Sequence, residues 1–393
     1  MILHIDKENM MENRTKYDAV IIGFGKGGKT MAGALGAAGK KVALIEKSDR
    51  MYGGTCINVG CIPTKSLVYR AGLAAAKGGS FEEKAAAYKA AMEQKEDLTA
   101  RLRGKNYQKL DSNPNITVID GTASFQSPHV VEVEKDGRTF QVEGEQIFIN
   151  TGSSAFIPPI EGLKGNPYVY TSEGLLNLTE LPSRLVIIGG GVIGMEFAQY
   201  YSDFGKKVTV LEAMDRILPG MDREIAQNLK MILKKRGVEI HTKAAVTRVE
   251  KKEQGGWLCY YKEGAPSGKE GQEAIVSADG LLLAVGRSAC GDGIFSPELA
   301  GRAGVERGRI PVDEHYQTRI PGVYAVGDVT GGIQLAHAAA AQGLLALDHM
   351  KGRLPSRSIQ VIPSCVYTDP EIASVGMTAD EAKAAGIPVK TGK

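Results

Sequence analysis

The stretch DAVIIGFGKGG spans residues 18–28 and determines the fold of the chain's first part. Its first five residues predict a buried strand, a Gly-x-Gly-x-x-Gly loop follows at once, and a helix and a second strand ending on Glu46 come next. The loop glycines are Gly23, Gly25 and Gly28. In this context the first permits a tight turn, the second lets the backbone approach a pyrophosphate, and the third lets helix and strand pack closely. The pattern predicts a dinucleotide-binding unit in which Glu46 accepts hydrogen bonds from a ribose.

The same pattern returns 166 residues later. The strand LVII at residues 185–188 precedes the loop GGGVIG, and the strand VTVLE ends on Glu212. The glycines of this second loop are Gly189, Gly191 and Gly194. One such loop could be a glycine-rich turn without a ligand, but two complete copies in equal register argue against that reading. The chain is expected to have an α/β fold with two Rossmann-like domains that bind two dinucleotides.

Two cysteines lie between the loops, in the segment MYGGTCINVGCIPTK. An ideal helix rises ~1.5 Å per residue and would separate Cys56 from Cys61 by ~7.5 Å. A disulfide needs Cα atoms within ~7 Å of each other, so we expect a distorted turn that Gly60 and Pro63 permit. Lys65 follows Cys61 by one helical turn, and a nearby ammonium lowers a thiol pKa from ~8.5 to between ~3.5 and ~7.5. The segment predicts a redox-active pair and not two inert buried thiols.

The segment GGTCINVGCIPTK resembles the signature of the class I pyridine nucleotide–disulfide oxidoreductases, a family that includes glutathione reductase, lipoamide dehydrogenase and mercuric reductase. Similar segments are Asn150-Thr151-Gly152, Ala284-Val285-Gly286-Arg287 and residues 318–343. The resemblance runs from about Tyr17 to the last residues and implies FAD at the first loop and NADH, or less favourably NADPH, at the second. The phrases VIIGFGKGGKT and TSEGLLNLTELP look most like the family's reactive-chlorine-resistance branch. Its members are flavin disulfide reductases linked to hypothiocyanous acid and to metal ions such as copper(II).

The resemblance implies roles for individual residues. Cys61 would be the thiol next to the flavin, and Cys56 the interchange thiol that meets the substrate. Lys65 would lie near flavin N5 and pair with Glu196, while Asp328 would hydrogen-bond the ribityl chain. The expected FAD-binding residues are Gly23, Gly25, Gly28, Glu46, Lys47, Gly54, Thr55, Lys65, Thr151, Gly152, Asp328, Leu335, Ala336 and His337. The expected NAD-binding residues are Gly189, Gly191, Gly194, Glu212 and Gly286.

The family architecture implies three domains. Residues 16–152 and 280–345 would form the FAD domain, residues 153–279 an inserted NAD domain, and residues 346–393 the start of an α+β interface domain. In the family the last domain makes the dimer and carries a His-Pro…Glu motif, but no histidine here precedes a proline. The chain is therefore expected to be a truncated version of a longer homodimeric protein. The stretch 81–110 predicts a long solvated helix with surface charges, and residues 246–276 predict a β-meander.

Composition restricts the partners and the compartment. The 48 basic and 45 acidic residues give a net charge of +3. This small charge gives no electrostatic reason to expect binding to nucleic acid or to an anionic membrane. No apolar run is long enough to span a bilayer, and the first 16 residues do not resemble a signal peptide. Five cysteines exclude a secreted disulfide framework, and the six histidines have no metal-binding spacing. We expect a cytoplasmic protein without a metal cofactor, in which Cys259, Cys290 and Cys365 are small buried residues.

The expected activity passes electrons from NADH through FAD to the Cys56–Cys61 disulfide and on to a small oxidant. That oxidant would be hypothiocyanous acid, a related reactive chlorine product, or an ion such as copper(II) or mercury(II). Lipoamide dehydrogenase and mercuric reductase are alternatives within the family. Outside the enzymes, the alternative is a catalytically silent protein that responds to nucleotides.

Overall fold

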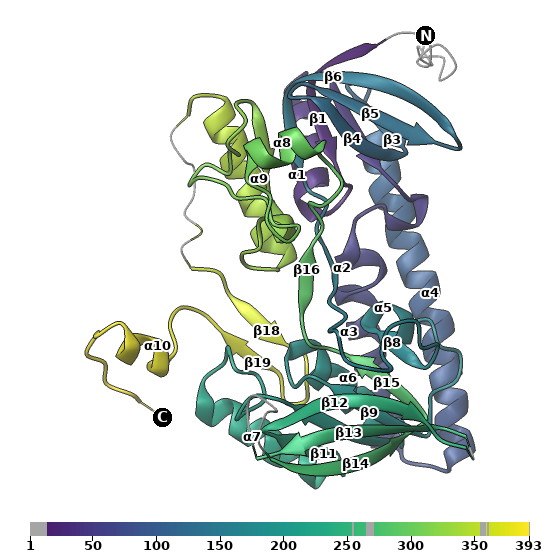
Figure 1. Ribbon diagram of the computed structural model, residues 1–393. Coiled ribbons are helices and arrows are strands. Elements are labelled where there is room, and N and C mark those ends of the chain that lie inside the picture. The colour runs from purple at the N-terminus through teal and green to yellow at the C-terminus, as the bar shows by residue number, and fades with distance from the viewer. Residues whose placement is uncertain (1–13, 254, 265–270, 354–358, 360, 393) are drawn as a thin grey trace. The chain divides into compact units, whose positions relative to one another are not determined.

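The computed structural model describes residues 14–253, 255–264, 271–353, 359 and 361–392. The chain divides into two compact units, each with a sheet of its own in which parallel strands predominate (Figure 1). The first unit consists of Met1–Cys61, Leu98–Ser154 and Ser288–Gln360, and the second of Ile62–Asp97, Ala155–Arg287 and Val361–Lys393. The three-domain division expected from the family stays a prediction.

A seven-stranded sheet forms the centre of the first unit, in the order β3-β2-β1-β6-β5-β4, with β17 also paired to β6. The neighbours β3, β2, β1 and β6 run parallel, as do β6 and β17, while β5 and β4 are antiparallel additions. Its strands are β1 (Thr15–Ile22), β2 (Val42–Glu46), β3 (Ile116–Asp120), β4 (Thr122–Ser127), β5 (Val130–Lys135), β6 (Arg138–Ile149) and β17 (Val323–Ala325). β2 is buried along its whole length, which explains its continuous apolar sequence, because a parallel sheet is covered on both faces.

Two helices of the first unit pack closely at glycines. A Cβ atom on Gly343 of α9 would lie 2.9 Å from Cγ of Met31 in α1, so the two helices approach where a side chain is missing. The elements that complete this unit are α1 (Lys26–Ala37), η2 (Asp49–Met51), α2 (Thr55–Asn58), α8 (Pro297–Ala303), η3 (Gly327–Thr330) and α9 (Ala336–Met350). The long helix expected at 81–110 is confirmed as α4 (Phe81–Asp111), whose C-terminal part from Leu98 belongs to this unit.

The second unit has a five-stranded parallel sheet in the order β11-β10-β9-β15-β8 and a three-stranded antiparallel sheet of β12, β13 and β14. β18 and β19 form a separate antiparallel pair. The strands are β8 (Val169–Thr171), β9 (Arg184–Ile188), β10 (Lys207–Glu212), β11 (Glu239–Thr242), β12 (Ala244–Lys251), β13 (Trp257–Glu263), β14 (Gln272–Ala278), β15 (Gly280–Leu283), β18 (Ser364–Val366) and β19 (Ile372–Ser374). The predicted meander is confirmed, although its second turn, at 266–268, lies outside the described residues. Two short strands, β7 (Ser153–Ala155) and β16 (Arg287–Ala289), occur where the chain passes from one unit to the other.

The helices of the second unit include α3, whose first residue, Cys61, is the last residue of the first unit's N-terminal segment. They are α3 (Cys61–Lys77), α5 (Ser172–Leu175), α6 (Val192–Asp203), α7 (Arg223–Lys235) and α10 (Ala379–Ala384). α10 begins with a capping box, in which the Thr378 hydroxyl accepts from the Glu381 amide and the Glu381 carboxylate accepts from the Thr378 amide.

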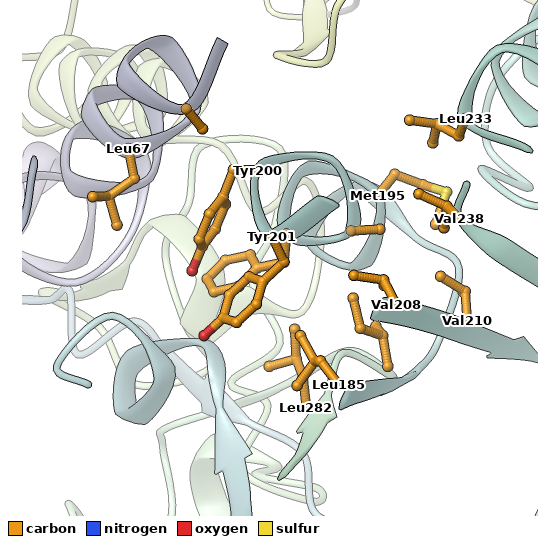
Figure 2. Close-up of a cluster of buried hydrophobic side chains, with 14 of the residues drawn as sticks. Leu67, Leu185, Met195, Tyr200, Tyr201, Val208, Val210, Leu233, Val238 and Leu282 are labelled. Carbon is orange, nitrogen blue, oxygen red and sulfur yellow. The ribbon is translucent and has the colours of Figure 1, made fainter. Parts of the chain in front are cut away.

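The main core of the second unit anchors α3. Leu67 and Ala71 of this helix are fully buried in one cluster with Tyr200 and Tyr201 of α6. Figure 2 shows Leu67, the two tyrosines and residues of the parallel sheet in this cluster. This buried face fixes the rotation of α3 about its own axis.

Replacing Leu67 with alanine is expected to destabilise this unit by ~2–5 kcal/mol, because the substitution leaves a cavity in a packed core. Leu73→Ala is the matched control, since Leu73 lies on the same helix with 53% of its surface exposed. The control should change stability by no more than ~0.5 kcal/mol. Urea denaturation followed by circular dichroism measures both values, and equal losses would contradict the anchoring role of Leu67.

Candidate redox and dinucleotide sites

The two cysteines flank a break between two helices. Cys56 lies in α2, Cys61 begins α3, and the helical path is interrupted at Val59, whose φ is −140°. A Cβ atom on Gly60 would lie 3.1 Å from the carbonyl oxygen of Thr55, which explains the small residue at the break. The distorted turn predicted from the sequence is therefore confirmed. Both cysteines are half-buried.

This cysteine turn packs directly on the first glycine loop. Gly54 has a φ of +77°, and a Cβ atom at that position would lie 2.5 Å from Cα of Gly25. The two backbones thus approach so closely that neither a side chain nor a water molecule fits between them. The segment that carries Cys56 is held against the loop expected to receive a dinucleotide pyrophosphate.

Helix α4 also contacts the cysteine turn. The Asn58 amide nitrogen donates to the carbonyls of Tyr52 (3.1 Å) and Gly54 (3.0 Å), and Arg103 of α4 donates to the Asn58 amide oxygen (3.2 Å). The Tyr52 ring stacks on the ring of Tyr107, which follows Arg103 by four residues on α4, and the ring centroids are 4.8 Å apart. The sequence prediction placed the charges of this helix at the surface, which is wrong for Lys95, a buried side chain, while Arg103 is half-buried and holds the cysteine turn. Only the tertiary packing reveals that role.

A lysine in the first turn of α1 is bonded to helix α4. Lys29 Nζ donates to the side-chain oxygen of Asn106 (2.5 Å), whose amide nitrogen donates to the carbonyl of Leu102 (2.7 Å). The pKa of Lys29 is lowered to about 8, chiefly by burial and also by the charges of Lys26 and Lys109, while a negative charge on Cys56 opposes this shift. Asn106 also lies beside the cysteine turn, since a Cβ atom on Gly53 would be 3.4 Å from its side-chain carbon, and the sequence analysis did not anticipate this role.

The first glycine loop has the geometry that a dinucleotide requires. Gly23 has a φ of +105°, and a Cβ atom there would lie 2.3 Å from the Asn150 carbonyl oxygen. A Cβ atom on Gly28 would lie 2.1 Å from the Gly23 carbonyl oxygen. Glu46 accepts from the amides of Phe24 (2.9 Å) and Ser48 (3.3 Å), and its burial raises the pKa of this carboxyl. The N-terminus of α1 has no acidic residue in its first turn, so it can receive an anion.

The second loop repeats this geometry in the second unit. Gly189 has a φ of +110°, and a Cβ atom on Gly194 would lie 2.0 Å from the Gly189 carbonyl oxygen. Glu212 accepts from the amides of Gly190 (2.5 Å) and Met214 (2.6 Å), at positions offset by the same 166 residues. The predicted internal repeat is therefore confirmed at the level of single hydrogen bonds. Both loops fit a dinucleotide phosphate, since each offers a helix N-terminus and a backbone that a ligand can approach.

The remaining candidates for FAD binding lie around η3 and α9. Asp328 in η3 accepts from the Ser153 hydroxyl (2.6 Å), and Thr151 donates to the Cys290 carbonyl (2.7 Å). The Gly327 amide donates to Gln342 of α9 (2.7 Å), which ties η3 to that helix. The first unit contains Gly23, Gly25, Gly28, Glu46, Lys47, Gly54, Thr55, Thr151, Gly152, Asp328, Leu335, Ala336 and His337. The second unit contains Lys65 and all the expected NAD residues, Gly189, Gly191, Gly194, Glu212 and Gly286.

The expected partners Lys65 and Glu196 are both in contact with Tyr367. The Lys65 ammonium lies 3.5 Å from the centroid of the Tyr367 ring, and Glu196 accepts from the Tyr367 amide (2.9 Å). Burial raises the pKa of Glu196, and the Tyr367 amide and the charge of Lys65 oppose this rise. The two side chains thus interact electrostatically in the second unit, and their functional role stays a prediction.

Cys365 is a further thiol in this neighbourhood. Its pKa is raised chiefly by burial, while Lys65 acts to lower it and Glu196 to raise it. The expectation that the three remaining cysteines are buried is correct for Cys259 and wrong for Cys290 and Cys365, which are half-buried. Their environment could not be read from the sequence because each lies in a short irregular or two-stranded segment.

Two further properties concern the described part of the chain. None of its helices combines the length and the apolar character needed to cross a membrane. In the same part of the chain, no three or more His, Cys, Asp or Glu side chains are grouped so that they could hold a metal ion.

Comparison with known families identifies two matching regions. A model described as pyridine nucleotide-disulphide oxidoreductase matches residues 17–343. A second, described as the dimerisation domain of the same family, matches residues 362–393.

Similar proteins and structures agree with these matches. The probable pyridine nucleotide-disulfide oxidoreductase RclA of Escherichia coli is 41% identical over 377 residues, which cover 95% of this chain and 80% of that protein. A dihydrolipoyl dehydrogenase of Bacillus subtilis is 37% identical over 381 residues, again 95% of this chain and 80% of the relative. A solved structure, the copper(II) complex of the HOCl-induced flavoprotein disulfide reductase RclA from Escherichia coli, superimposes with a TM-score of 0.83 at 41% identity. The superposition covers 95% of this chain and 80% of the solved chain.

Two glycines of the second loop should respond differently to alanine. Gly194→Ala places a Cβ atom 2.0 Å from a carbonyl oxygen, so the loop must rearrange and nucleotide binding should be lost. Gly191→Ala meets no atom of the described chain within 4 Å, so the fold should persist. Its methyl group would still obstruct the approach of a pyrophosphate and raise the KM for the nicotinamide nucleotide by about tenfold or more. Steady-state kinetics, with flavin absorbance as the control for the first unit, measures this. An unchanged KM in Gly191→Ala would contradict the assignment.

Proposed function

The chain belongs to the pyridine nucleotide-disulphide oxidoreductase family, and we propose that it passes electrons from NADH through FAD to the Cys56–Cys61 pair and from Cys56 to a small oxidant. As a member of this family it is a flavin-dependent oxidoreductase, so the alternative of a catalytically silent protein is set aside. The observation that carries the proposal is the contact of the cysteine turn with the first glycine loop, Gly54 against Gly25. It holds the thiol pair next to a dinucleotide-binding backbone.

The residues of the first unit would hold FAD, with its pyrophosphate at the N-terminus of α1 and its ribose at Glu46. FAD, when bound, supplies the two-electron transfer between a nicotinamide and the cysteine pair. The chain's own contribution is to hold the two thiols beside that cofactor. The break at Val59 and Gly60 supports their assignment as a redox pair, because an unbroken helix would keep the cysteines too far apart to form a disulfide.

We assign the reaction with the oxidant to Cys56. A Cys56 thiolate would attack the sulfur of hypothiocyanous acid, forming a sulfur–sulfur bond as hydroxide leaves. Cys61 would then attack the Cys56 sulfur and displace thiocyanate, which leaves the Cys56–Cys61 disulfide for reduction by two electrons from NADH. With copper(II), two ions would each accept one electron from the dithiol. The similarity to RclA, described as HOCl-induced and solved with copper(II), supports a small oxidant of this kind.

The second dinucleotide would be NADH, because Glu212 ends β10 where the adenosine ribose is expected. Its carboxylate would accept from a ribose 2′-hydroxyl and repel a 2′-phosphate. Arg216 is the nearest base that could offset this repulsion, but it donates to Asp380 (3.2 Å) and to the Pro219 carbonyl (3.0 Å). The local geometry therefore offers no uncommitted cation for NADPH among the described residues of that loop.

The expected kcat/KM is at least about tenfold higher for NADH than for NADPH, since a like-charge contact costs several kcal/mol. Glu212→Ser should reduce this preference, and Arg216→Ser should leave it unchanged because that guanidinium is already engaged. Initial rates with both nucleotides at saturating oxidant provide the measurement. A higher kcat/KM for NADPH would contradict the proposal.

The oxidant and the two thiol roles can be tested together. The expected kcat/KM is higher with hypothiocyanous acid than with glutathione disulfide or lipoamide, since a small electrophile needs no shaped pocket. Cys56→Ser should stop turnover and keep the long-wavelength absorption of a thiolate beside the flavin, whereas Cys61→Ser should lose that absorption. Lipoamide turnover equal to the best small oxidant would instead favour a dihydrolipoyl dehydrogenase, the second candidate, which relatives at 35–39% identity support. Exchanged spectra of the two variants would overturn the thiol assignment.

We further propose a homodimer, which the match of residues 362–393 to the family's dimerisation domain supports. A cytoplasmic location is proposed on chemical grounds, because cytosolic disulfides are usually transient and catalytic.

A further inference from the structure

An arginine beside the second glycine loop is held by the C-terminal part of the chain. Arg216 follows Glu212 by four residues. Its guanidinium donates to the carboxylate of Asp380 in α10 (3.2 Å) and to the carbonyl of Pro219 (3.0 Å). α10 lies in the region that matches the family's dimerisation domain, outside the two Rossmann-like repeats. A residue far along the sequence therefore compensates the charge of Arg216.

The loop that carries Arg216 is fixed against the second glycine loop. The Leu218 amide donates to the Gly190 carbonyl (2.8 Å), and a Cβ atom on Gly190 would lie 3.1 Å from Cγ2 of Ile217. The amide of the same glycine donates to Glu212 (2.5 Å). Leu218 is buried with a φ of +46°, a conformation that residues with a Cβ seldom adopt. Such a residue persists only where the surrounding structure determines it, so Arg216 is kept at the border of the expected ribose site.

The charges around Arg216 balance one another. The Asp380 carboxylate also lies 3.7 Å from the guanidinium of Arg223, the first residue of α7, and that guanidinium lies 3.6 Å from the Asp215 carboxylate. Asp380 is the member of this network that contacts both arginines. Exposed ion pairs add little to stability, but they do set the local electrostatic potential. The pair of Arg216 and Asp380 thus presents no net charge to an approaching phosphate.

This neutral pair bears on the choice between the two nicotinamide nucleotides, which differ by a phosphate at the 2′-position of the adenosine ribose. A guanidinium whose charge is not compensated binds a phosphate well, because its planar fork donates two parallel hydrogen bonds. An arginine four residues beyond the ribose glutamate would therefore favour NADPH if its charge were free. The contact with Asp380 removes that advantage.

We propose that Asp380 is a specificity-determining residue, which disfavours NADPH by engaging the guanidinium of Arg216. The inference rests on the proposed binding of a nicotinamide nucleotide at the second glycine loop. Glu212 then repels the 2′-phosphate, and Asp380 withholds the cation that would offset this repulsion. The nucleotide preference is thus determined by α10 as well as by the loop that binds the nucleotide.

The binding of two small probes tests the inference without turnover. Adenosine 2′,5′-bisphosphate and 5′-AMP differ only in the 2′-phosphate, so the ratio of their dissociation constants reports recognition of that group alone. Isothermal titration calorimetry on the FAD-loaded protein measures the ratio, because bound FAD keeps the probes from the first glycine loop. Asp380→Asn should strengthen binding of the bisphosphate relative to AMP by about tenfold, the size expected for one charge-assisted contact. Asp380→Glu should keep the wild-type ratio, since it retains the carboxylate.

Two double variants of equal net charge identify the cation. Asp380→Asn combined with Arg216→Ser should return the ratio to the wild-type value, because the released guanidinium is gone. Asp380→Asn combined with Arg223→Ser should keep the shifted ratio, because Arg216 is still present. Equal ratios in the two double variants would overturn the inference, since the shift would then follow the net charge and not Arg216.

Asp369→Asn is the matched control. Asp369 lies in the same C-terminal region, and its carboxylate accepts from Arg236 (2.7 Å), so the same charge is removed from the same kind of ion pair. Arg223 begins α7 and Arg236 follows its last residue, which places the two pairs ~20 Å apart at ~1.5 Å per residue. Since the Debye length is ~8 Å at physiological ionic strength, this variant should keep the wild-type ratio.

The single variant and the wild-type protein separate failure of the inference from failure of the proposed function. An unchanged ratio in Asp380→Asn, with AMP still bound, would overturn the role of Asp380 and leave the proposed preference for NADH intact. Tighter binding of the bisphosphate than of AMP by the wild-type protein would overturn both, because the second loop would then favour a 2′-phosphate.

Discussion

The contact between Gly54 and Gly25 is the constraint on which the proposed redox site depends. At this point two backbone segments touch with no room for a β-carbon, and each lies next to a functional group. Gly25 caps the helix proposed to receive the cofactor's phosphates, and Gly54 precedes the helix that carries Cys56. Electron transfer between a cofactor and a thiol pair needs contact, and a side chain at either glycine would separate the two segments. The positive φ at Gly54 strengthens this requirement, because residues with a Cβ seldom adopt it.

The two glycine loops show the same physical solution at two places in one chain. In each, a strand-ending glutamate accepts the amide of the loop's second residue and the amide two residues beyond itself. A buried carboxylate is costly to desolvate, and these amide donors offset part of that cost. The carboxylate thereby fixes the glycine loop before any ligand arrives. The residue that would recognise the ribose is the one that holds the phosphate loop in shape.

Helix α4 joins the cysteine turn to the first turn of α1. Arg103, Asn106 and Tyr107 lie on one face of this helix because residues three or four apart are neighbours on an α-helix. They contact Asn58, Lys29 and Tyr52 respectively, so one rigid element positions both of these segments. A shift of α4 would therefore change the geometry of both together.

The sequence by itself determined the strands, the glycine loops, the broken turn between Cys56 and Cys61, and the family. These features depend on local rules: glycine at positive φ, apolar runs for buried parallel strands, and residue spacing along a helix. The tertiary structure alone decided which distant residues meet within each unit. The approach of Gly54 to Gly25, the roles of Arg103, Asn106 and Lys29, and the contacts of Tyr367 with Lys65 and Glu196 join residues far apart in the chain. No periodicity or spacing encodes such pairs, because they arise only when separate elements pack, and their energies depend on burial that a sequence does not display.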